Sequence, residues 1–269
     1  MQKTILLTGA TDGIGLEAAK MIVLQGHTVL LHGRNPAKLA KVERELAVLA
    51  GGGQVESYVA DLARITDVEA MVKAIGERHS SLDVLINNAG VFRTSTPITE
   101  DGLDVRFVVN TIAPYLLVQR LLPMMASSGR IVNLSSAAQS PVNLNALAGR
   151  IQIADDFTAY AQSKLAITMW SRTLALSLGS TGPVVVAVNP GSMLGTKMVR
   201  EAFNVAGGDV RIGADIVTRA ALSDEFANAS GQYFDNDARR FAPPHPDALD
   251  AQKSAAVVGV IEAVLANLQ

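Results

Sequence analysis

The sequence predicts an α/β fold in which one doubly wound parallel sheet is flanked by helices on both faces. Short apolar runs typical of buried strands alternate with helix-length amphipathic segments, and this alternation favours a parallel sheet covered on both sides. The length of 269 residues suits one domain spanning 1–269, because α/β folds of about 250 residues are routinely single domains. The sequence contains no polar linker or internal repeat that would divide it.

Six apolar runs are predicted to form the strands of this sheet. They cover residues 3–8, 28–31, 55–59, 84–86, 131–134 and 184–188. Helical spacing follows the first run at 16–25, and Pro36 is expected to open a second helix that ends before Gly51 to Gly53. The stretch 241–247, which contains three prolines, is predicted to be a surface loop.

Charge and composition argue against several classes of function. A net charge of −2, a pI near 6.1 and scattered basic residues give no reason to expect a nucleic-acid partner. Apolar stretches such as 255–268 fall short of the roughly 18 apolar residues of a spanning helix, and the early first strand leaves no signal peptide. The absence of cysteine excludes disulfides and fits a cytoplasmic protein, and the four dispersed histidines indicate no metal.

Gly9, Gly13 and Gly15 lie between the first predicted strand and the helix that follows it. At such a junction, glycines permit a tight turn, let the backbone approach a pyrophosphate and leave the helix N-terminus free to bind anionic oxygens. Their spacing, G-x-x-x-G-x-G, differs from the G-x-G-x-x-G fingerprint, although the context is the same. A loop that merely turns the chain is the alternative. The turn therefore predicts a Rossmann-type, dinucleotide-binding fold.

A second motif, Tyr160-Ala-Gln-Ser-Lys164, brings together a phenol and an ammonium group. Residues four apart share one face of a helix, so Lys164 can lie near Tyr160 and favour its ionisation. An unperturbed phenol has a pKa of about 10, and this pKa is expected to fall if the group is to act near neutrality. Alone, the pair is explained as well by an exposed aromatic residue beside a solvated lysine. Together with the glycine turn, it indicates a nicotinamide-dependent oxidoreductase.

These motifs and several others in order resemble the short-chain dehydrogenase/reductase family over essentially the whole chain. Asn87-Asn88-Ala89-Gly90 and Asn189-Pro190-Gly191 are similar to further family segments. The resemblance implies that Ser136 holds the substrate oxygen and that Asn110 anchors a water. It implies a catalytic set made of Asn110, Ser136, Tyr160 and Lys164. It also implies cofactor contacts from Thr8, Gly9, Thr11, Asp12, Gly13, Ile14, Gly15, Arg34, Asn35, Asp61, Leu62, Asn88, Ala89, Gly90, Tyr160, Lys164, Pro190, Gly191 and Thr196.

The end of the second predicted strand, His32-Gly33-Arg34-Asn35, predicts a preference for NADP(H), with NAD(H) as the second choice. Gly33 stands where an NAD-dependent protein usually carries an acid that accepts bonds from the ribose 2′-hydroxyl. The guanidinium of Arg34 can instead pair with the 2′-phosphate of NADP. An exposed loop arginine is the alternative, and Asp12 departs from NADP-binding relatives that have a basic residue there.

Two segments, 137–159 and 192–212, are expected to border a small-molecule substrate. The 24 positions from Ser136 to Tyr160 exceed the connection usual in the family and, with Gly231-Gln-Tyr-Phe234, resemble the branch of retinol dehydrogenases and WW-domain oxidoreductases. The apolar side chains of these segments predict a hydrophobic ketone, aldehyde or alcohol. Simple packing of the loops onto the body is the alternative. The side chains are Val142, Leu144, Leu147, Ile151, Ile153, Met193, Leu194, Met198 and Phe203.

Two other functions are compatible with this fold. A catalytically silent NADP-binding regulator or scaffold would keep the fold without turnover, but the complete catalytic set favours an enzyme. A sugar-nucleotide epimerase or dehydratase also uses Tyr-x-x-x-Lys, but the glycine spacing and the modest length argue against it. The sequence leaves open the physiological substrate, the direction of the reaction and whether the chain forms a homo-oligomer.

Overall fold

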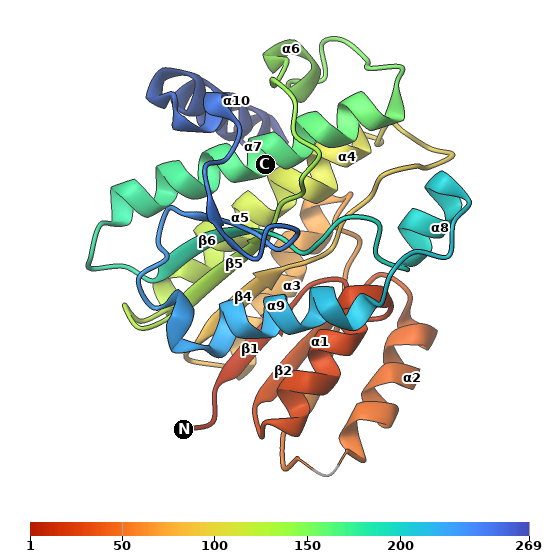
Figure 1. Ribbon diagram of the computed structural model, residues 1–269, viewed down its shortest axis with the longest axis vertical. Helices are drawn as coiled ribbons and strands as arrows, with labels where there is room; N and C mark the ends of the chain where they lie inside the picture. Colours follow the sequence, from red (N-terminus) through yellow and green to blue (C-terminus); the bar gives the residue numbers. More distant parts are fainter. Residues whose placement is uncertain (50, 269) are drawn as a thin grey trace.

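The computed structural model describes residues 1–49 and 51–268, and its strands form one sheet (Figure 1). The sheet has eight strands in the order β3-β2-β1-β4-β5-β6-β7-β8. The first six coincide, to within two residues at either end, with the six predicted runs. The strands are β1 Thr4–Leu7, β2 Thr28–Gly33, β3 Val55–Val59, β4 Val84–Asn87, β5 Arg130–Leu134, β6 Val184–Asn189, β7 Tyr233–Asp235 and β8 Arg240–Ala242.

The last two strands were not predicted from the sequence. Strands β1 to β7 all pair in parallel with their neighbours in the sheet. Strand β8 runs antiparallel to β7, with Phe234 opposite Phe241. The prediction of a surface loop over 241–247 is therefore wrong at its start. Phe241 packs against Phe226 at 5.2 Å and Phe234 at 5.1 Å between ring centroids. Three-residue strands carry too little alternation to be recognised, and pairing with the sheet edge decides their conformation.

The helices begin and end near the signals in the sequence. Pro36 is the first residue of α2 and the Asn35 side chain caps it, as the proline predicted. α4 and α5 are joined by a π-helical turn, Val108–Ile112. The helices are α1 Gly13–Leu24, α2 Pro36–Ala47, α3 Ile65–Arg78, α4 Val105–Phe107, α5 Ala113–Leu121, α6 Leu144–Leu147, α7 Asp156–Leu178, α8 Lys197–Phe203, α9 Val210–Leu222 and α10 Ala251–Leu268.

Helices cover both faces of the sheet, as predicted, and Figure 1 shows α1, α2 and α9 in front of it. Successive residues of β1 point to opposite faces. Ile5 and Leu7 enter the hydrophobic core shared with α1, α2 and α9, whereas Leu6 enters the core shared with α3, α5, α7 and α10. All three side chains are fully buried. The strand is buried on both faces because of these two helical layers, which explains why it appears in the sequence as a continuous apolar run.

Among the residues that the structure describes, two helical stretches are long and apolar enough to cross a membrane by length and composition. The prediction that no segment is long and apolar enough to span a membrane is therefore wrong. A segment can reach a mean hydropathy of 1.2 over 18 residues even when it contains a charged residue such as Glu262. The stretch Val105–Met124 is 72% buried within the protein, as expected of a core helix. Ala251–Leu268 is 28% buried. The absence of a membrane partner accordingly stays a prediction.

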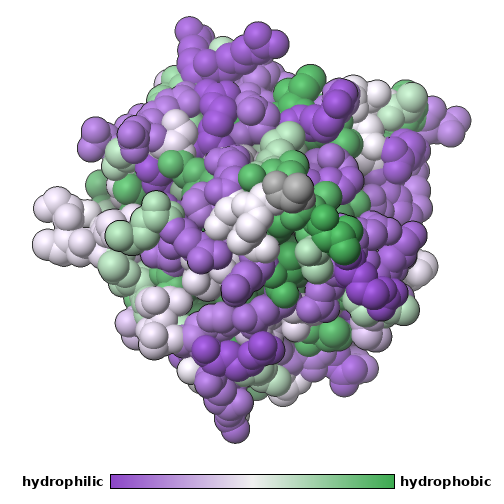
Figure 2. Space-filling view, turned by 90° about the horizontal axis from the view of Figure 1, so that it is seen from below, coloured by the Kyte–Doolittle hydropathy of each residue, from purple (hydrophilic) through white to green (hydrophobic). Residues whose placement is uncertain are grey.

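The order of the strands determines where a ligand can bind. The chain runs outward from β1 through β2 to β3 and then returns to β4 on the other side of β1. The carboxyl ends of β1 and β4 form the switch point at which open α/β sheets bind their ligands. Figure 2 shows the molecule from below, the end at which the chain begins in Figure 1, with hydrophilic residues over much of the surface and hydrophobic residues between them.

Candidate active site

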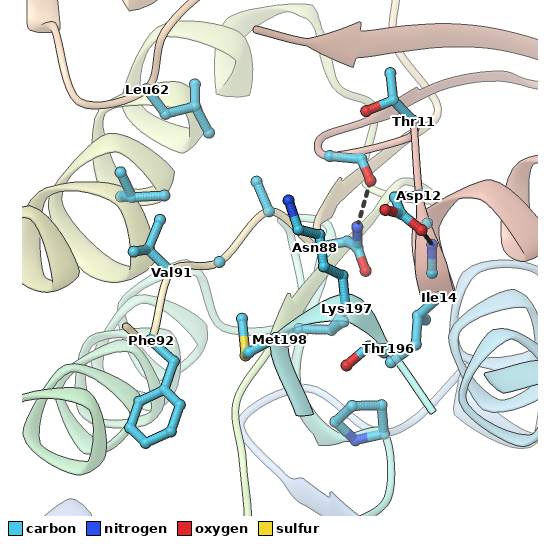
Figure 3. A pocket seen from close by; sticks show the side chains of 18 of the residues that line it. Thr11, Asp12, Ile14, Leu62, Asn88, Val91, Phe92, Thr196, Lys197 and Met198 are labelled. Carbon is cyan, nitrogen blue, oxygen red and sulfur yellow. Dashed lines mark hydrogen bonds between the residues drawn. The ribbon is translucent and has the colours of Figure 1, made fainter. Parts of the chain in front are cut away.

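A cleft of about 540 Å³ lies at the carboxyl ends of the strands. Its lining contains all but two of the residues predicted for the cofactor and the reaction; the two that do not line it are Thr8 and Asn110. Figure 3 shows Thr11 and Asp12 on one side of this pocket, with Phe92 and Met198 on the other. Residues that are far apart in the sequence thus meet around one elongated space.

The glycine turn after β1 has little room for side chains. Gly9 has a φ of +68°, and a Cβ there would lie 2.9 Å from the Cα of Ala89. A Cβ on Gly15 would lie 2.2 Å from the Gly9 carbonyl oxygen. These positions therefore require glycine for the close approach of the turn to helix α1 and to the segment after β4. The cradle they form fits the phosphates of a dinucleotide, as the motif predicted.

Thr8 and Asn88 lock the turn in place. The Thr8 hydroxyl accepts hydrogen bonds from the backbone N–H groups of Asn88 and Ala89 at 3.0 and 3.1 Å. The Asn88 amide donates to the carbonyl oxygens of Thr8 and Gly9 at 2.8 and 3.1 Å. Thr8 is 1% exposed, so its place is behind the cleft. We conclude that Thr8 shapes the turn through these contacts.

His32, which the sequence left without a role, supports the same turn. Its Nδ1 accepts from the N–H of Gly9 at 3.2 Å, and its Nε2 lies 3.0 Å from the carbonyl oxygen of Ala60. One acceptor and one donor nitrogen describe a neutral imidazole. Burial lowers the pKa of His32, which is 3% exposed, and this favours the neutral form. His32 is therefore a structural link between β1, β2 and the end of β3.

The far end of the cleft is basic. Gly33 ends β2, and a Cβ there would lie 2.7 Å from Thr11 Cγ2, so a larger side chain would crowd the turn. Arg34 and Asn35 line the cleft as predicted. Lys38 also lines it, although the sequence reasoning passed it over. Its signal was the spacing of four residues from Arg34, which can place both cations at the start of α2.

Tyr160, Lys164 and Ser136 line the opposite part of the cleft. The Lys164 Nζ donates to the carbonyl oxygen of Leu134 at 2.7 Å and lies 5.8 Å from the centre of the Tyr160 ring. Burial lowers the pKa of Lys164 to about 8. The three side chains come from the end of β5 and from one face of α7, so the predicted i, i+4 arrangement is present.

The pKa of Tyr160 shifts in the direction opposite to the sequence prediction. Burial raises this pKa, and a hydrogen bond with Ser136 opposes the increase. The expected fall is not found because the cost of burying a phenolate is larger than the stabilisation from Ser136. A raised pKa keeps the phenol protonated, which is the form that donates a proton to a developing alkoxide.

The two serines after β5 have different surroundings. The Ser135 hydroxyl lies 2.6 Å from that of Thr168 and 3.2 Å from the Lys164 carbonyl oxygen, and Ser135 is 3% exposed. Ser136 is only partly buried and lines the cleft next to Tyr160. Ser135 also lines the cleft, but its hydroxyl is engaged by Thr168 and the Lys164 backbone, and the choice of Ser136 stays a prediction.

Asn110 is at the centre of the π-helical turn and is fully buried. Its Oδ1 accepts from the N–H of Val91 at 2.8 Å, and its Nδ2 donates to the Val91 carbonyl and to Ser163 Oγ, both at 2.9 Å. Both amide hydrogens are thereby engaged by protein atoms. Asn110 ties the segment after β4 to α7, and the anchoring of a water stays a prediction.

Two residues that the sequence analysis did not assign hold the backbone of Ser136. The Tyr233 hydroxyl donates to the Ser136 carbonyl oxygen at 3.1 Å, and the Gln139 amide donates to the same oxygen at 2.9 Å. Gln139 also accepts from the N–H of His245 at 3.3 Å. Strand β7 and the segment before α10 therefore fix the position of Ser136. The motif Gly231-Gln-Tyr-Phe234 was the only signal for this contact in the sequence.

The two predicted substrate segments differ in their relation to the cleft. In 137–159, Leu147 is fully buried in the core and Val142, Leu144 and Ile153 pack against it, so packing explains these side chains. Ile151 is exposed, and none of these five lines the cleft among the described residues. In 192–212, Leu194 and Met198 do line it. A Cβ on Gly13 would lie 3.4 Å from Thr196 Cγ2, so the start of α8 closes over the glycine turn.

Comparison with known proteins agrees with this fold. Residues 3–206 match the family described as short chain dehydrogenase. Mouse (Mus musculus) retinol dehydrogenase 13 is 30% identical over 268 residues, covering 93% of this chain and 80% of the relative. The WW domain-containing oxidoreductase of Pongo abelii is 29% identical over 266 residues, covering 91% of this chain and 64% of the relative.

A solved structure gives the same result. The crystal structure of angucycline C-6 ketoreductase LanV with bound NADP superposes with a TM-score of 0.70 at 28% identity, covering 87% of this chain and 93% of that one. The chain belongs to the short-chain dehydrogenase family, in the branch of the retinol dehydrogenases and WW domain-containing oxidoreductases. The prediction of an NAD(P)-dependent oxidoreductase is thus confirmed at the level of the family.

Proposed function

We propose that this protein is an NADP(H)-dependent oxidoreductase that interconverts a hydrophobic ketone or aldehyde and its alcohol. The observation that carries the proposal is the meeting of Tyr160, Ser136 and Lys164 at one part of the cleft whose other part is the glycine turn. A hydroxyl pair beside a buried ammonium is suited to protonating an oxygen that gains negative charge. When bound, NADPH supplies the hydride.

Each side chain has a distinct part in this reaction. Ser136 donates a hydrogen bond to the substrate oxygen, and the contacts from Tyr233 and Gln139 to its carbonyl hold it there. Tyr160 gives its hydroxyl proton to that oxygen as negative charge develops. Lys164 keeps positive charge at the site, and its Nζ is positioned by the Leu134 carbonyl to reach a ribose hydroxyl. The apolar wall of Val91, Phe92, Leu194 and Met198 favours a hydrophobic substrate.

The experiment that tests this function is an assay of NADPH oxidation with a panel of ketones and aldehydes. Ser136→Ala is expected to lower kcat by about 10²–10³-fold, because one donor to the developing oxyanion is lost. Ser135→Ala is the matched control and is expected to retain most of the turnover, since Ser135 bonds to Thr168 and to the Lys164 backbone. Equal losses in the two variants would contradict the assignment of Ser136.

We expect NADPH to bind more tightly than NADH, with Arg34 as the main determinant. Gly33 stands where NAD-dependent proteins carry an acidic side chain for the ribose, and it has no carboxylate. Arg34 lines the cleft beside it. A charge-assisted bond of about 1.5–3 kcal/mol corresponds to roughly 10- to 150-fold in affinity. Titration of both cofactors against the native protein and Arg34→Ala measures this ratio. Arg44→Ala removes an exposed arginine of helix α2 that does not line the cleft, and it should leave the ratio unchanged.

A further inference from the structure

Three of the seven phenylalanines form one cluster. Phe92 lines the cleft beside Tyr160, and Phe157 and Phe203 pack against Phe92 just outside the residues that line the cleft. Phe92 follows β4, Phe157 lies in the first turn of α7, and Phe203 is the last residue of α8. The centroid of the Phe92 ring is 5.0 Å from that of Tyr160, 6.3 Å from that of Phe157 and 5.8 Å from that of Phe203. We call Phe92, Phe157 and Phe203 the aromatic mouth.

The aromatic mouth differs from the other phenylalanine cluster of the protein in its exposure. Phe226 and Phe234 are buried between the sheet and its helices, so their packing alone accounts for them. In the aromatic mouth, Phe157 is 50% exposed and Phe203 is 45% exposed, although Phe92 between them is 5% exposed. Leaving half of two phenyl rings in water costs free energy, and contiguous exposed apolar groups commonly mark a binding site.

The ring geometry favours a flat aromatic guest. The Phe203 ring is inclined by 23° to that of Phe92, which is a stacked pair, whereas Phe157 meets Phe92 edge-on at 80°. Faces and edges of aromatic rings at such separations attract a further ring through their quadrupoles, and a saturated ring of the same size lacks this attraction. Arg93 lies 5.8 Å from the centre of the Phe92 ring, within the range of a cation–π contact.

The position of the mouth relative to Tyr160 selects which part of the substrate it touches. The centre of the Phe92 ring is 5.0 Å from that of Tyr160 and both side chains line the cleft, so a carbonyl compound at Tyr160 occupies the same part of the cleft as Phe92. Phe203 ends helix α8, and backbone hydrogen bonds join the two ends of the segment that contains this helix: the N–H of Gly195 donates to the Gly208 carbonyl at 2.6 Å, and the N–H of Gly208 donates to the Met193 carbonyl at 2.8 Å. These bonds help to fix the place of Phe203 in the aromatic mouth.

From this geometry we propose that the aromatic mouth is a subsite for an aryl group attached directly to the reacting carbonyl. The substrate class is then an aryl ketone or aryl aldehyde, and a fused aromatic ketone uses the same contacts over a larger area. The proposal rests on the proposed function, since the reacting carbonyl is what brings the aryl group to Phe92. The aryl group contributes to binding, however, so the affinity of the subsite can be measured without turnover.

The binding experiment uses the protein saturated with NADP⁺, with which a ketone forms a complex that cannot be reduced. Calorimetry gives the Kd of 2-acetonaphthone and of its fully saturated analogue, methyl decahydronaphthyl ketone. The native protein is expected to bind the aryl ketone more tightly. Phe92→Leu and Phe203→Leu are each expected to lower the ratio of the two affinities by roughly 2- to 12-fold, with little change for the saturated ketone.

The matched control is Phe241→Leu, the same chemical change in a phenylalanine that packs against Phe226 and Phe234. This variant is expected to keep the native ratio, and thermal unfolding of all variants verifies that they are folded. A ratio that is unchanged in both Phe92→Leu and Phe203→Leu, or equal losses for aryl and saturated ketones, overturns the aromatic mouth. Aryl preference in binding without NADPH oxidation on any carbonyl supports the mouth and overturns the proposed function.

Discussion

Replacing Tyr160 with phenylalanine is expected to lower kcat by about 10²–10⁴-fold, the contribution typical of a positioned proton donor. The substitution removes only the hydroxyl, while the ring keeps its contact with Phe92 at 5.0 Å between centroids. Binding of the cofactor should therefore change little. Turnover of a ketone that the native protein reduces, together with the Kd of NADPH from fluorescence titration, measures both parts of the prediction.

The control for Tyr160→Phe is Tyr115→Phe, the same change on the α5 face of the core. The Tyr115 hydroxyl donates to Glu262 at 2.7 Å, so its loss removes a hydrogen bond between α5 and α10 and leaves the cleft untouched. Tyr115→Phe should lower stability slightly and retain turnover. Near-native turnover in Tyr160→Phe would sink the proposed mechanism.

Replacing Lys164 with methionine is expected to abolish turnover and yet stabilise the free protein. Burial lowers the pKa of this lysine from 10.5 to about 8, so the folded state is penalised for holding the ammonium. At about 1.4 kcal/mol for each pKa unit, the penalty at pH 7 is roughly 3 kcal/mol. The lost bond from this charged donor to the Leu134 carbonyl offsets about 1.5–3 kcal/mol of the penalty, which leaves a gain of at most about 1.5 kcal/mol.

The pH dependence of this gain identifies its cause. Below pH 8 both the folded and the unfolded chain carry the charged lysine, and the folded chain bears the full penalty. Between about pH 8 and 10.5 the folded chain holds fewer protons than the unfolded chain, so the native protein gains stability as the pH rises and the advantage of Lys164→Met shrinks. Urea unfolding of both proteins across this range measures the difference. A constant difference at all pH values would show that packing, and not charge, is responsible.

Much of the architecture follows from local properties of the sequence. The continuous apolar runs of β1 to β6 predicted a buried parallel sheet, because a strand covered by helices on both faces has no polar side. Gly9 and Gly15 predicted a dinucleotide turn, since their positions leave no room for a Cβ. Tyr160 and Lys164 were recognisable because residues four apart share one face of a helix.

Other features were decided by the tertiary structure, because they depend on contacts between distant residues. Three-residue strands such as β8 form only where the edge of a sheet is available to pair with them. The pKa of Tyr160 was predicted to fall, but burial of the phenol raises it, and the Tyr-x-x-x-Lys motif carries no information on that burial.

The surroundings of the candidate catalytic residues are likewise a product of folding. Tyr233 reaches the carbonyl of Ser136 across 97 positions of the chain. Phe92, in the segment after β4, stacks on Phe203, at the end of α8, and no spacing in the sequence predicts such a contact. The sequence by itself determined the sheet, the dinucleotide turn and the Tyr160–Lys164 pair, since local periodicity and backbone sterics govern them. Only the tertiary structure decided the protonation of the phenol, the support of Ser136 and the aromatic mouth, because burial and contacts between distant residues govern these three features.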